Sequence, residues 1–344
     1  MRVLATISDI SRLGVVLDLE SGASETIPVY PDFIDPTVKG RVGCRPFGIT
    51  WSPDELFIAN NRQLLVFDRQ LEYLRTETTP LQINTHQLAY HSSRAWAVSP
   101  WTNSLIGVYP GSDIGAVEFA LFGQNVRPYV PRETAEADDK WHFNSLLWAG
   151  GYLFVAAHNF DRPSFINRYD AETLRLNAIQ DDAGVAIHGL ALCDNELFWL
   201  STKTGEIRSS LGYSLSLFKQ GYARGFAMTR EHFVVATSQF LCRDERCGGD
   251  SWIQVIDRRQ GALAAEFHLP DTGSINDLRL LDEYDYAHCV NPFWVGSKAF
   301  EAPPPLYTRH GLREPSDVTI SDVTISDDMI QECVGMKISS TQNQ

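Results

Sequence analysis

The sequence predicts an all-β protein, and more narrowly a six-bladed β-propeller. The first observation behind this prediction is that short apolar segments recur between tight polar turns, with no long stretch of helical periodicity among them. The second is that these segments group into repeats of the length of a propeller blade. The third is that the amino-terminal end offers the strands that the last repeat lacks. A seven-bladed ring is the alternative that such repeats leave open.

Six segments share one pattern, in which a polar residue precedes an apolar strand and a polar turn leads to a second strand. In chain order they are CRPFGITWSPDELFIANN, NTHQLAYHSSRAWAVSP, WHFNSLLWAGGYLFVAAH, IHGLALCDNELFWLS, YARGFAMTREHFVVATS and SINDLRLLDEYDYAHCV. The polar residues ahead of the first strands, here called the head residues, are Arg45, His86, His142, His188, Arg224 and Asn276. They follow one another at intervals of 36 to 56 residues, enough for about four short strands each.

The two ends of the chain predict how the ring closes. The amino-terminal stretches VLATIS, GVVLDLESG and SETIPVY are strands with no inner strand of their own. The last repeat supplies an inner strand in SINDLRLL, with YAHCVNPF as a possible second strand. We expect the amino-terminal strands to join this last blade, because the pairing covers sheet edges that would otherwise stay open.

A single propeller domain is expected over residues 1–300, and residues 301–344 differ from it in composition. APPP marks a linker, the pentamer SDVTI occurs twice in SDVTISDVTISDD, and the final SSTQNQ is polar. Such sequence buries too little apolar surface to fold, so a flexible tail is expected. An added strand on a partner or on the propeller rim is the alternative.

The composition excludes several classes of function. Acidic residues outnumber basic ones by 43 to 29, and a surface with a net charge of −14 repels nucleic-acid backbones. No apolar run approaches the roughly 18 residues of a membrane span, and the first apolar run is too short for a signal peptide. We therefore expect a cytoplasmic protein with a small-molecule substrate and neither a nucleic-acid nor a membrane partner. Nothing in the sequence indicates the oligomeric state.

The cysteines do not form a disulfide framework. The six cysteines are Cys44, Cys193, Cys242, Cys247, Cys289 and Cys333. They are scattered through a long chain, and only CRDERC brings two of them close together. One such pair is a weak signal for zinc, a local redox pair is a second interpretation, and an ordinary loop is the third.

Propeller geometry predicts where the head residues meet. The first strand of each blade lines the central channel, and the loop entering it opens on the same face as the loop between the second and third strands. The head residues are therefore expected to ring one mouth of the channel. The ends of the second strands predict an outer ring there: Asn60, Trp101, His158, Lys203, Gln239 and Asn291. Asn144 and Asp277, close to two of the heads, are expected to face the channel as well.

Three heads on consecutive blades are histidines: His86, His142 and His188. Neutral imidazole is a common ligand of zinc, iron and copper, and three such ligands leave coordination positions open for a substrate. These residues predict a transition-metal site of iron, copper or zinc. Two alternatives stay open. In one the histidines bind a ligand or transfer protons without a metal, and in the other the polar side chains only hold water and satisfy strand ends.

The arginines among the heads predict an anionic substrate, because Arg45 and Arg224 present forked donors that suit a carboxylate. The other expected substrate-binding residues are Asn276, Lys203, Gln239 and Trp101. The expected catalytic residues are Asp277, Asn144 and His158, as general base or as groups that orient the reacting atoms.

Together these residues predict an enzyme that acts on a small, carboxylate-bearing substrate by oxidation, lyase or hydrolytic chemistry, for instance in small-molecule biosynthesis. The alternative is a propeller without catalysis that binds a peptide or a glycan on the same face. No nucleotide cofactor is indicated, because AGGY is a hairpin turn with no helix after it.

Four stretches resemble the signatures of a bacterial propeller family. RPFGITW, HFNSLLW, YARGFAM and RCGGDSWIQVIDRRQGALAAEFHLPDTGSINDLRLL are similar to the Arg-Pro, His-x-Asn, Arg-Gly and Cys-Gly-x-Trp-hydrophobic-Asp motifs of the DUF4915/TIGR03032 group. The resemblance covers residues 40–290 in short motifs. It implies a β-propeller, and because the group has no agreed activity it carries no catalytic residues over to this chain.

Overall fold

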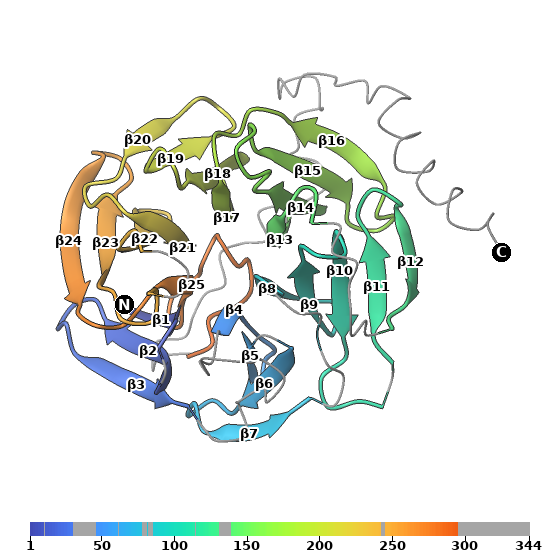
Figure 1. The fold of residues 1–344 in the computed structure, drawn as a ribbon, viewed down its shortest axis with the longest axis horizontal. Coiled ribbons are helices and arrows are strands. Elements are labelled where there is room, and N and C mark those ends of the chain that lie inside the picture. The colour runs from blue at the N-terminus through green and yellow to red at the C-terminus, as the bar shows by residue number, and fades with distance from the viewer. Residues whose placement is uncertain are drawn as a thin grey trace.

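The computed structural model describes residues 1–9, 11–29, 46–60, 62–77, 81, 85–113, 115–130, 139–241 and 245–294. Within these ranges the strands form six antiparallel sheets, arranged as blades around one axis (Figure 1). The predicted six-bladed propeller is confirmed, and the seven-bladed alternative is wrong. The described ranges hold no helix with the length and hydropathy that crossing a bilayer requires. The domain boundary predicted at residue 300 and the tail after it lie outside them.

The blades follow one another in chain order, and in each of the first five the first strand is the innermost. The first of these contains β4 (Pro46–Trp51), β5 (Leu56–Asn60), β6 (Gln63–Phe67) and β7 (Tyr73–Thr76). The next has five strands, β8 (Leu88–His91), β9 (Arg94–Ser99), β10 (Ser104–Val108), β11 (Val117–Ala120) and β12 (Asn125–Pro128). It is followed by β13 (Phe143–Ala149), β14 (Tyr152–Ala157), β15 (Phe165–Asp170) and β16 (Leu176–Gln180). Then come β17 (Ile187–Cys193), β18 (Glu196–Ser201), β19 (Glu206–Ser209) and β20 (Ser214–Ser216). The fifth contains β21 (Tyr222–Met228), β22 (His232–Ser238), β23 (Ser251–Asp257) and β24 (Ala262–Leu269).

The last blade is built from both ends of the chain. Its strands, from the axis outward, are β25 (Ile275–Leu280), β1 (Arg2–Ile7), β2 (Arg12–Asp18) and β3 (Ser24–Pro28). β1 pairs antiparallel with β25, and Leu4 lies opposite Arg279. The predicted closure of the ring by the amino-terminal strands is confirmed.

The second strand expected in YAHCVNPF is wrong, because β1 already occupies the edge of β25 that such a strand would need. Residues 282–294 instead pack at the end of the ring where the inner strands finish. There the Trp294 amide donates to the Leu281 carbonyl (2.7 Å), and the Trp51 indole donates to the carbonyl of Asn291 (2.7 Å). Asn291 therefore lies at the opposite end from the mouth where the outer ring was expected.

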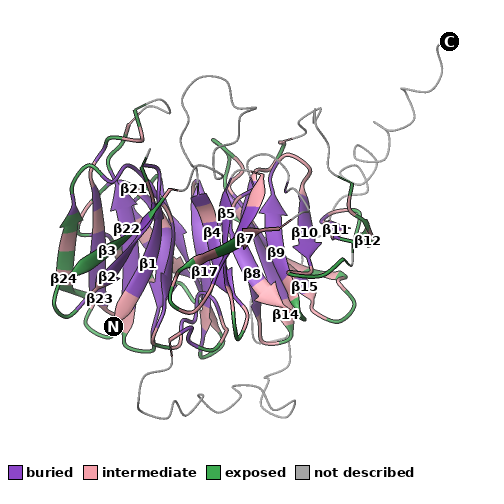
Figure 2. Ribbon diagram, turned by 90° about the horizontal axis from the view of Figure 1, so that it is seen from below, coloured by how far each residue is buried: buried purple, intermediate pink, exposed green. Residues whose placement is uncertain are grey.

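The hydrophobic core lies between neighbouring blades, where the faces of adjacent sheets meet. One cluster joins Leu4 of the last blade to Trp51 of the blade that begins with β4. In another, the Trp148 and Trp96 rings of adjacent blades lie 5.8 Å apart between their centroids. Strands close to the axis, such as β1, are almost wholly buried, whereas the outer strand β24 is largely exposed (Figure 2). Burial between blades supplies the main driving force for folding and leaves polar side chains on the axis.

Five of the inner strands described carry a β-bulge near their first residues. In each, the inner strand has one residue more than its partner strand. The bulged residues are Phe47–Gly48 in β4, Asn144 in β13, Gly189 in β17, Arg224 in β21 and Asn276 in β25. A bulge breaks the regular alternation of side chains and re-aims them. Because the inner strands begin at the same end of the ring, these bulges direct side chains toward one mouth of the channel.

Candidate functional site

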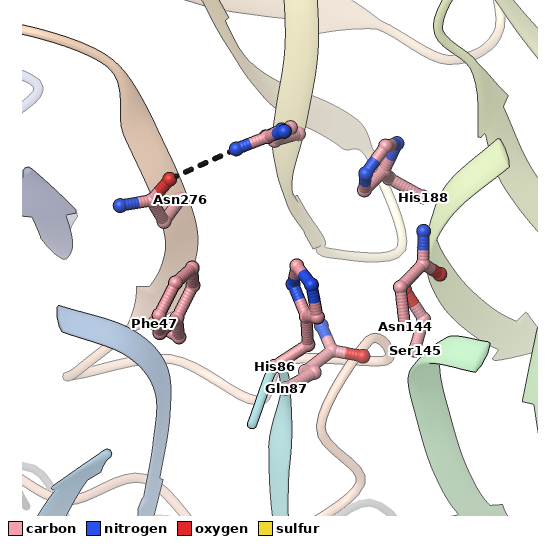
Figure 3. Close-up of a pocket in the computed structure, with 8 residues that line it drawn as sticks. Phe47, His86, Gln87, Asn144, Ser145, His188 and Asn276 are labelled. Carbon is pink, nitrogen blue, oxygen red and sulfur yellow. Dashed lines mark hydrogen bonds between the residues drawn. The ribbon is translucent and has the colours of Figure 1, made fainter. Parts of the chain in front are cut away.

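A small pocket lies on the propeller axis, at the end where the inner strands begin. Its lining residues are Phe47, His86, Gln87, Asn144, Ser145, His188, Arg224 and Asn276 (Figure 3). Each blade contributes at least one of them, from its inner strand or from the residues directly ahead of it. The enclosed space holds about one water molecule, so a larger ligand must extend into the open mouth above it.

The bulges of the inner strands build this pocket. Four of the lining residues, Phe47, Asn144, Arg224 and Asn276, belong to them. His188 directly precedes the fifth bulged residue, Gly189, whose backbone is left-handed at φ 61°. A Cβ atom on Gly189 would stand 2.6 Å from the Cβ of Phe226 in the neighbouring inner strand. Only glycine allows β17 to approach β21 this closely with His188 facing the pocket.

Four histidine rings lie in contact around one side of the mouth, and we call them the histidine arc. The ring centroids of His86 and His142 are 5.0 Å apart. Those of His142 and His158 are 5.3 Å apart, and those of His158 and His188 are 5.4 Å apart. Three head residues thus meet His158, which directly follows the second strand β14 of its blade. The four residues come from three different blades. All three contacts are edge-to-face, the arrangement that aromatic quadrupoles favour.

His188 is the most deeply buried member of the arc, with 5% of its surface exposed. Its Nδ1 lies 3.0 Å from the Ala186 carbonyl and 2.9 Å from the Thr202 hydroxyl. That hydroxyl donates its own hydrogen to the Ala223 carbonyl, so Nδ1 of His188 must be the donor in both contacts. Burial, together with the positive charge of Arg224, holds the pKa of His188 well below its usual range. The ring is therefore neutral, with the lone pair on Nε2.

His158 has the opposite tautomer. The backbone amide of Phe160 donates to its Nδ1 over 3.1 Å, so in the neutral ring the hydrogen resides on Nε2. Burial, then the neighbouring His142 ring and the cations of Arg224 and Lys203, lower the pKa of His158 to about 3. At neutral pH this ring is an uncharged N–H donor beside the lone pair of His188.

His142 is held by a carboxylate that the sequence analysis did not single out. Its Nδ1 lies 2.8 Å from one carboxylate oxygen of Asp139 and 3.0 Å from the other. A carboxylate only accepts hydrogen bonds, so Nδ1 carries the hydrogen and, in the neutral ring, Nε2 carries the lone pair. Carboxylate–histidine pairs of this kind fix the tautomer and the orientation of the ring. Asp139 could not be predicted from the sequence, because its surroundings, ETAEADDK, have a composition typical of solvated surface.

Arg224 brings a permanent positive charge into the pocket. Its Nη1 donates to Asn276 Oδ1 over 3.1 Å, and its guanidinium carbon lies 4.5 Å from the ring centroid of Tyr222. The Asn276 amide is fixed in turn by donating to Ser8 Oγ (3.0 Å) and to the Pro46 carbonyl (2.8 Å). Among the lining residues that the structure describes, Arg224 alone is permanently charged and none is acidic. This charge balance favours an anion over a cation.

The described residues contain no group of three His, Cys, Asp or Glu side chains placed to hold one metal ion. Two features of the histidine arc explain this finding. His158 carries its hydrogen on Nε2, because its Nδ1 accepts the Phe160 amide, and the rings pack edge to face against one another. The positive charge of Arg224 also opposes a cation at this position.

Asp277 lies beneath the pocket and is not one of its lining residues. Its carboxylate is buried, accepts the Ile49 amide (2.9 Å) and the Gln87 side-chain amide (3.3 Å), and lies 3.2 Å from Nη1 of Arg279. Burial raises the pKa of this carboxyl group. Gln87 also accepts the Leu146 amide over 3.1 Å, so Asp277 fixes a pocket side chain and ties together three inner strands.

Apart from Asn291, the outer-ring residues lie around the mouth without lining the pocket. Lys203 is exposed and forms an ion pair with Asp161 of the preceding blade. Gln239 is exposed and accepts the amide of Asp250 over 3.4 Å. Trp101 lies half-buried in the turn between β9 and β10. Arg45 and the CRDERC pair, through Cys242, lie outside the described residues.

Comparisons with known proteins bear on the fold. No family model and no curated protein matches the chain. A chain of a nidogen/laminin complex matches 81% of this chain and 97% of its own length, with 10% identity and a TM-score of 0.53. A protein of unknown function from Bacteroides caccae matches 81% of this chain and 97% of its own length, with 11% identity and a TM-score of 0.48. The first likeness supports the β-propeller fold of this chain and nothing beyond it.

Proposed function

We propose that the protein is an enzyme that binds a small carboxylate-bearing substrate in the mouth of the propeller and acts on it by acid–base chemistry. The observation that carries this proposal is the position of Arg224, a permanent cation beside the neutral His188 in a pocket without acidic lining residues. A carboxylate recognised there would gain charge-assisted hydrogen bonds from the guanidinium.

The histidine arc provides both partners of proton transfer. His142, oriented by Asp139, offers Nε2 as the proton acceptor, and His158 offers Nε2–H as a donor toward a developing negative charge. Such a pair suits proton abstraction next to a carboxylate, or addition and removal of water. Lyase and hydrolytic reactions of this kind fit a tailoring step in small-molecule biosynthesis.

The binding part of this proposal can be tested without knowing the substrate. We expect sodium acetate, compared with sodium chloride at equal ionic strength, to raise the melting temperature of the wild-type protein. Arg224→Met keeps most of the side-chain length and should abolish the effect. Arg230→Met, an exposed arginine at the far end of the same blade, is the matched control and should retain it. An acetate effect that survives Arg224→Met overturns the proposed site.

A metal held by His86, His142 and His188 is the competing form of the same enzyme. Iron, copper or zinc bound by these imidazoles would polarise a substrate or activate water. Elemental analysis of the purified protein separates the two forms. The metal-free form predicts far less than one equivalent of metal, also after reconstitution. Near-stoichiometric metal that falls in His142→Ala would establish the metal-dependent form.

A second candidate function is the binding of a peptide or a glycan without catalysis. Two exposed phenylalanines near the mouth favour it, because Phe160 is 43% exposed and Phe240 is 61% exposed. This function predicts partner binding that depends on the phenylalanines and is indifferent to Arg224→Met.

A further inference from the structure

We propose that the substrate carries a flat aromatic ring next to its carboxylate, and that this ring stacks on a wall of aromatic side chains beside Arg224. This inference rests on the proposed function and names its substrate class. We call the wall the aromatic wall and define it by Phe160, His158, His188, Tyr222 and Phe240.

The rings of the aromatic wall form a continuous series across three blades. The centroids of Phe160 and His158 are 5.9 Å apart, and His158 and His188 follow at 5.4 Å. The His188 and Tyr222 centroids are 6.1 Å apart, and those of Tyr222 and Phe240 are 6.0 Å apart. Aromatic surfaces at these separations offer both faces and edges to a further ring.

Exposure along the wall rises from the pocket toward the rim. His188 in the middle is buried, whereas Phe160 and Phe240 at the two ends are 43% and 61% exposed. Two large apolar rings left open to water beside a pocket are typical of a binding surface and contribute little to the core. The wall thus starts at the pocket and ends in solvent on both sides.

The charge of Arg224 fixes where the anionic end of the ligand lies. Its guanidinium carbon is 4.5 Å from the Tyr222 centroid, so the cation lies against the wall at Tyr222. Arg246 reaches the same ring, at 5.2 Å. A carboxylate bound by Arg224 brings whatever is attached to it onto the wall, because the enclosed pocket below has room for about one water molecule.

A flat ring fits this surface better than an aliphatic group of equal size. Stacked or edge-to-face contacts add an electrostatic attraction between quadrupoles that a saturated ring cannot provide. The wall is also built mostly from rigid rings, which lose little conformational entropy when a ligand binds.

The experiment compares three carboxylates by titration calorimetry: benzoate, cyclohexanecarboxylate and acetate. Wild-type protein is expected to bind benzoate most tightly, about 10-fold more tightly than acetate, and to bind cyclohexanecarboxylate more weakly than benzoate. Phe160→Leu and Phe240→Leu keep an apolar side chain and remove the ring. Each should weaken benzoate binding about 3- to 10-fold and leave acetate binding unchanged.

Phe218→Leu is the matched control, because Phe218 is 49% exposed and follows β20, the outermost strand of its blade. It should leave benzoate binding unchanged. The inference is overturned if cyclohexanecarboxylate binds as tightly as benzoate, or if neither wall variant weakens benzoate binding. In those cases the proposed function still stands if acetate binds the wild type and does not bind Arg224→Met. If all three anions bind the Arg224→Met variant as tightly as the wild type, both the inference and the proposed function are overturned.

Discussion

The Nδ1–H group of His142 donates a hydrogen bond to the carboxylate of Asp139, three residues earlier in the chain, over 2.8 Å. The pair stands ahead of β13, at the mouth of the channel, and the His142 ring touches both His86 and His158. A short loop therefore decides which nitrogen of a histidine at the mouth is available for chemistry.

Asp139→Ala removes the acceptor that holds this tautomer. We expect the hydrogen of His142 to move from Nδ1 toward Nε2, which leaves Nε2 unable to accept a proton from a substrate. Two-bond ¹H–¹⁵N correlation spectra of protein labelled in its histidines report the tautomer directly. Asp161→Ala, which removes the nearby partner of Lys203, is the control. Unchanged His142 signals in Asp139→Ala would show that the loop does not set the tautomer.

Acidification should destabilise the protein through the histidine arc. Burial lowers the pKa of His158 to about 3 and that of His188 well below its usual range. An unfolded histidine binds its proton near pH 6.5, so the unfolded state takes up protons in this window that the folded state does not. The contribution of these rings is complete above about pH 6.5 and is lost as the pH falls toward 3.

Asparagine retains the hydrogen bond made at Nδ1 but does not titrate. His158→Asn and His188→Asn should therefore show a melting temperature that falls less steeply than that of the wild type between pH 7 and 4. His232→Asn, at the far end of β22, serves as the control. The variants are compared with the wild type because Asp285 titrates in the same range. Burial raises the pKa of Asp285 to about 6, so the contribution of Asp285 to stability is lost as the pH rises. Parallel curves for wild type and both variants would contradict this account.

Gly189→Ala should destabilise the fold by about 2–5 kcal/mol. For an alanine at this position the left-handed backbone costs about 1–2 kcal/mol, and the steric clash of its Cβ with Phe226 costs about 1–3 kcal/mol. Gly151→Ala is a matched control, since Gly151 has φ 76° with no atom within 4 Å of a Cβ placed there. Urea unfolding of both variants isolates the packing contribution. Equal losses in the two variants would mean that β17 can move away from β21 at little cost.

Asp277→Asn should lower stability by about 3 kcal/mol or more, because it leaves the buried guanidinium of Arg279 without its carboxylate. Asp282→Asn breaks the partly exposed pair with Arg2 and should cost less than about 1 kcal/mol. Chemical unfolding at neutral pH measures both. A loss at Asp277 as small as that at Asp282 would argue against its role as a tie between inner strands.

The blade count could be predicted from the sequence because it depends on local signals, and the closure of the ring because the last repeat lacks strands that the amino-terminal segment offers. Turns such as SPDE and CDNE end each first strand, and the apolar strands between them leave few ways to pair. The grouping of His86, His142 and His188 also follows from the repeat, since equivalent positions in blades return to one axis.

The fine structure of the site depends on contacts between blades, which a linear pattern does not contain. The bulges at Asn144 and Arg224 shift the pairing of the inner strand with its neighbour by one residue. Such a shift cannot be predicted from the type of residue at the bulge. The position of Asp277 next to the head residue Asn276 predicts a side chain that faces the channel. The bulge at Asn276 instead places Asp277 beneath the pocket. The segment YAHCVNPF has enough apolar residues to predict a strand, yet the edge it would pair with is already taken by β1.

The pairing of β1 with β25 also sets a condition on biosynthesis. β1 is synthesised before its partner β25, which begins at Ile275, and must wait for it for tens of seconds at ordinary elongation rates. Until β25 has emerged, the nascent chain therefore displays an unsatisfied β edge on β1. A message truncated before that codon would yield an open crescent, prone to associate with other chains through the same edge.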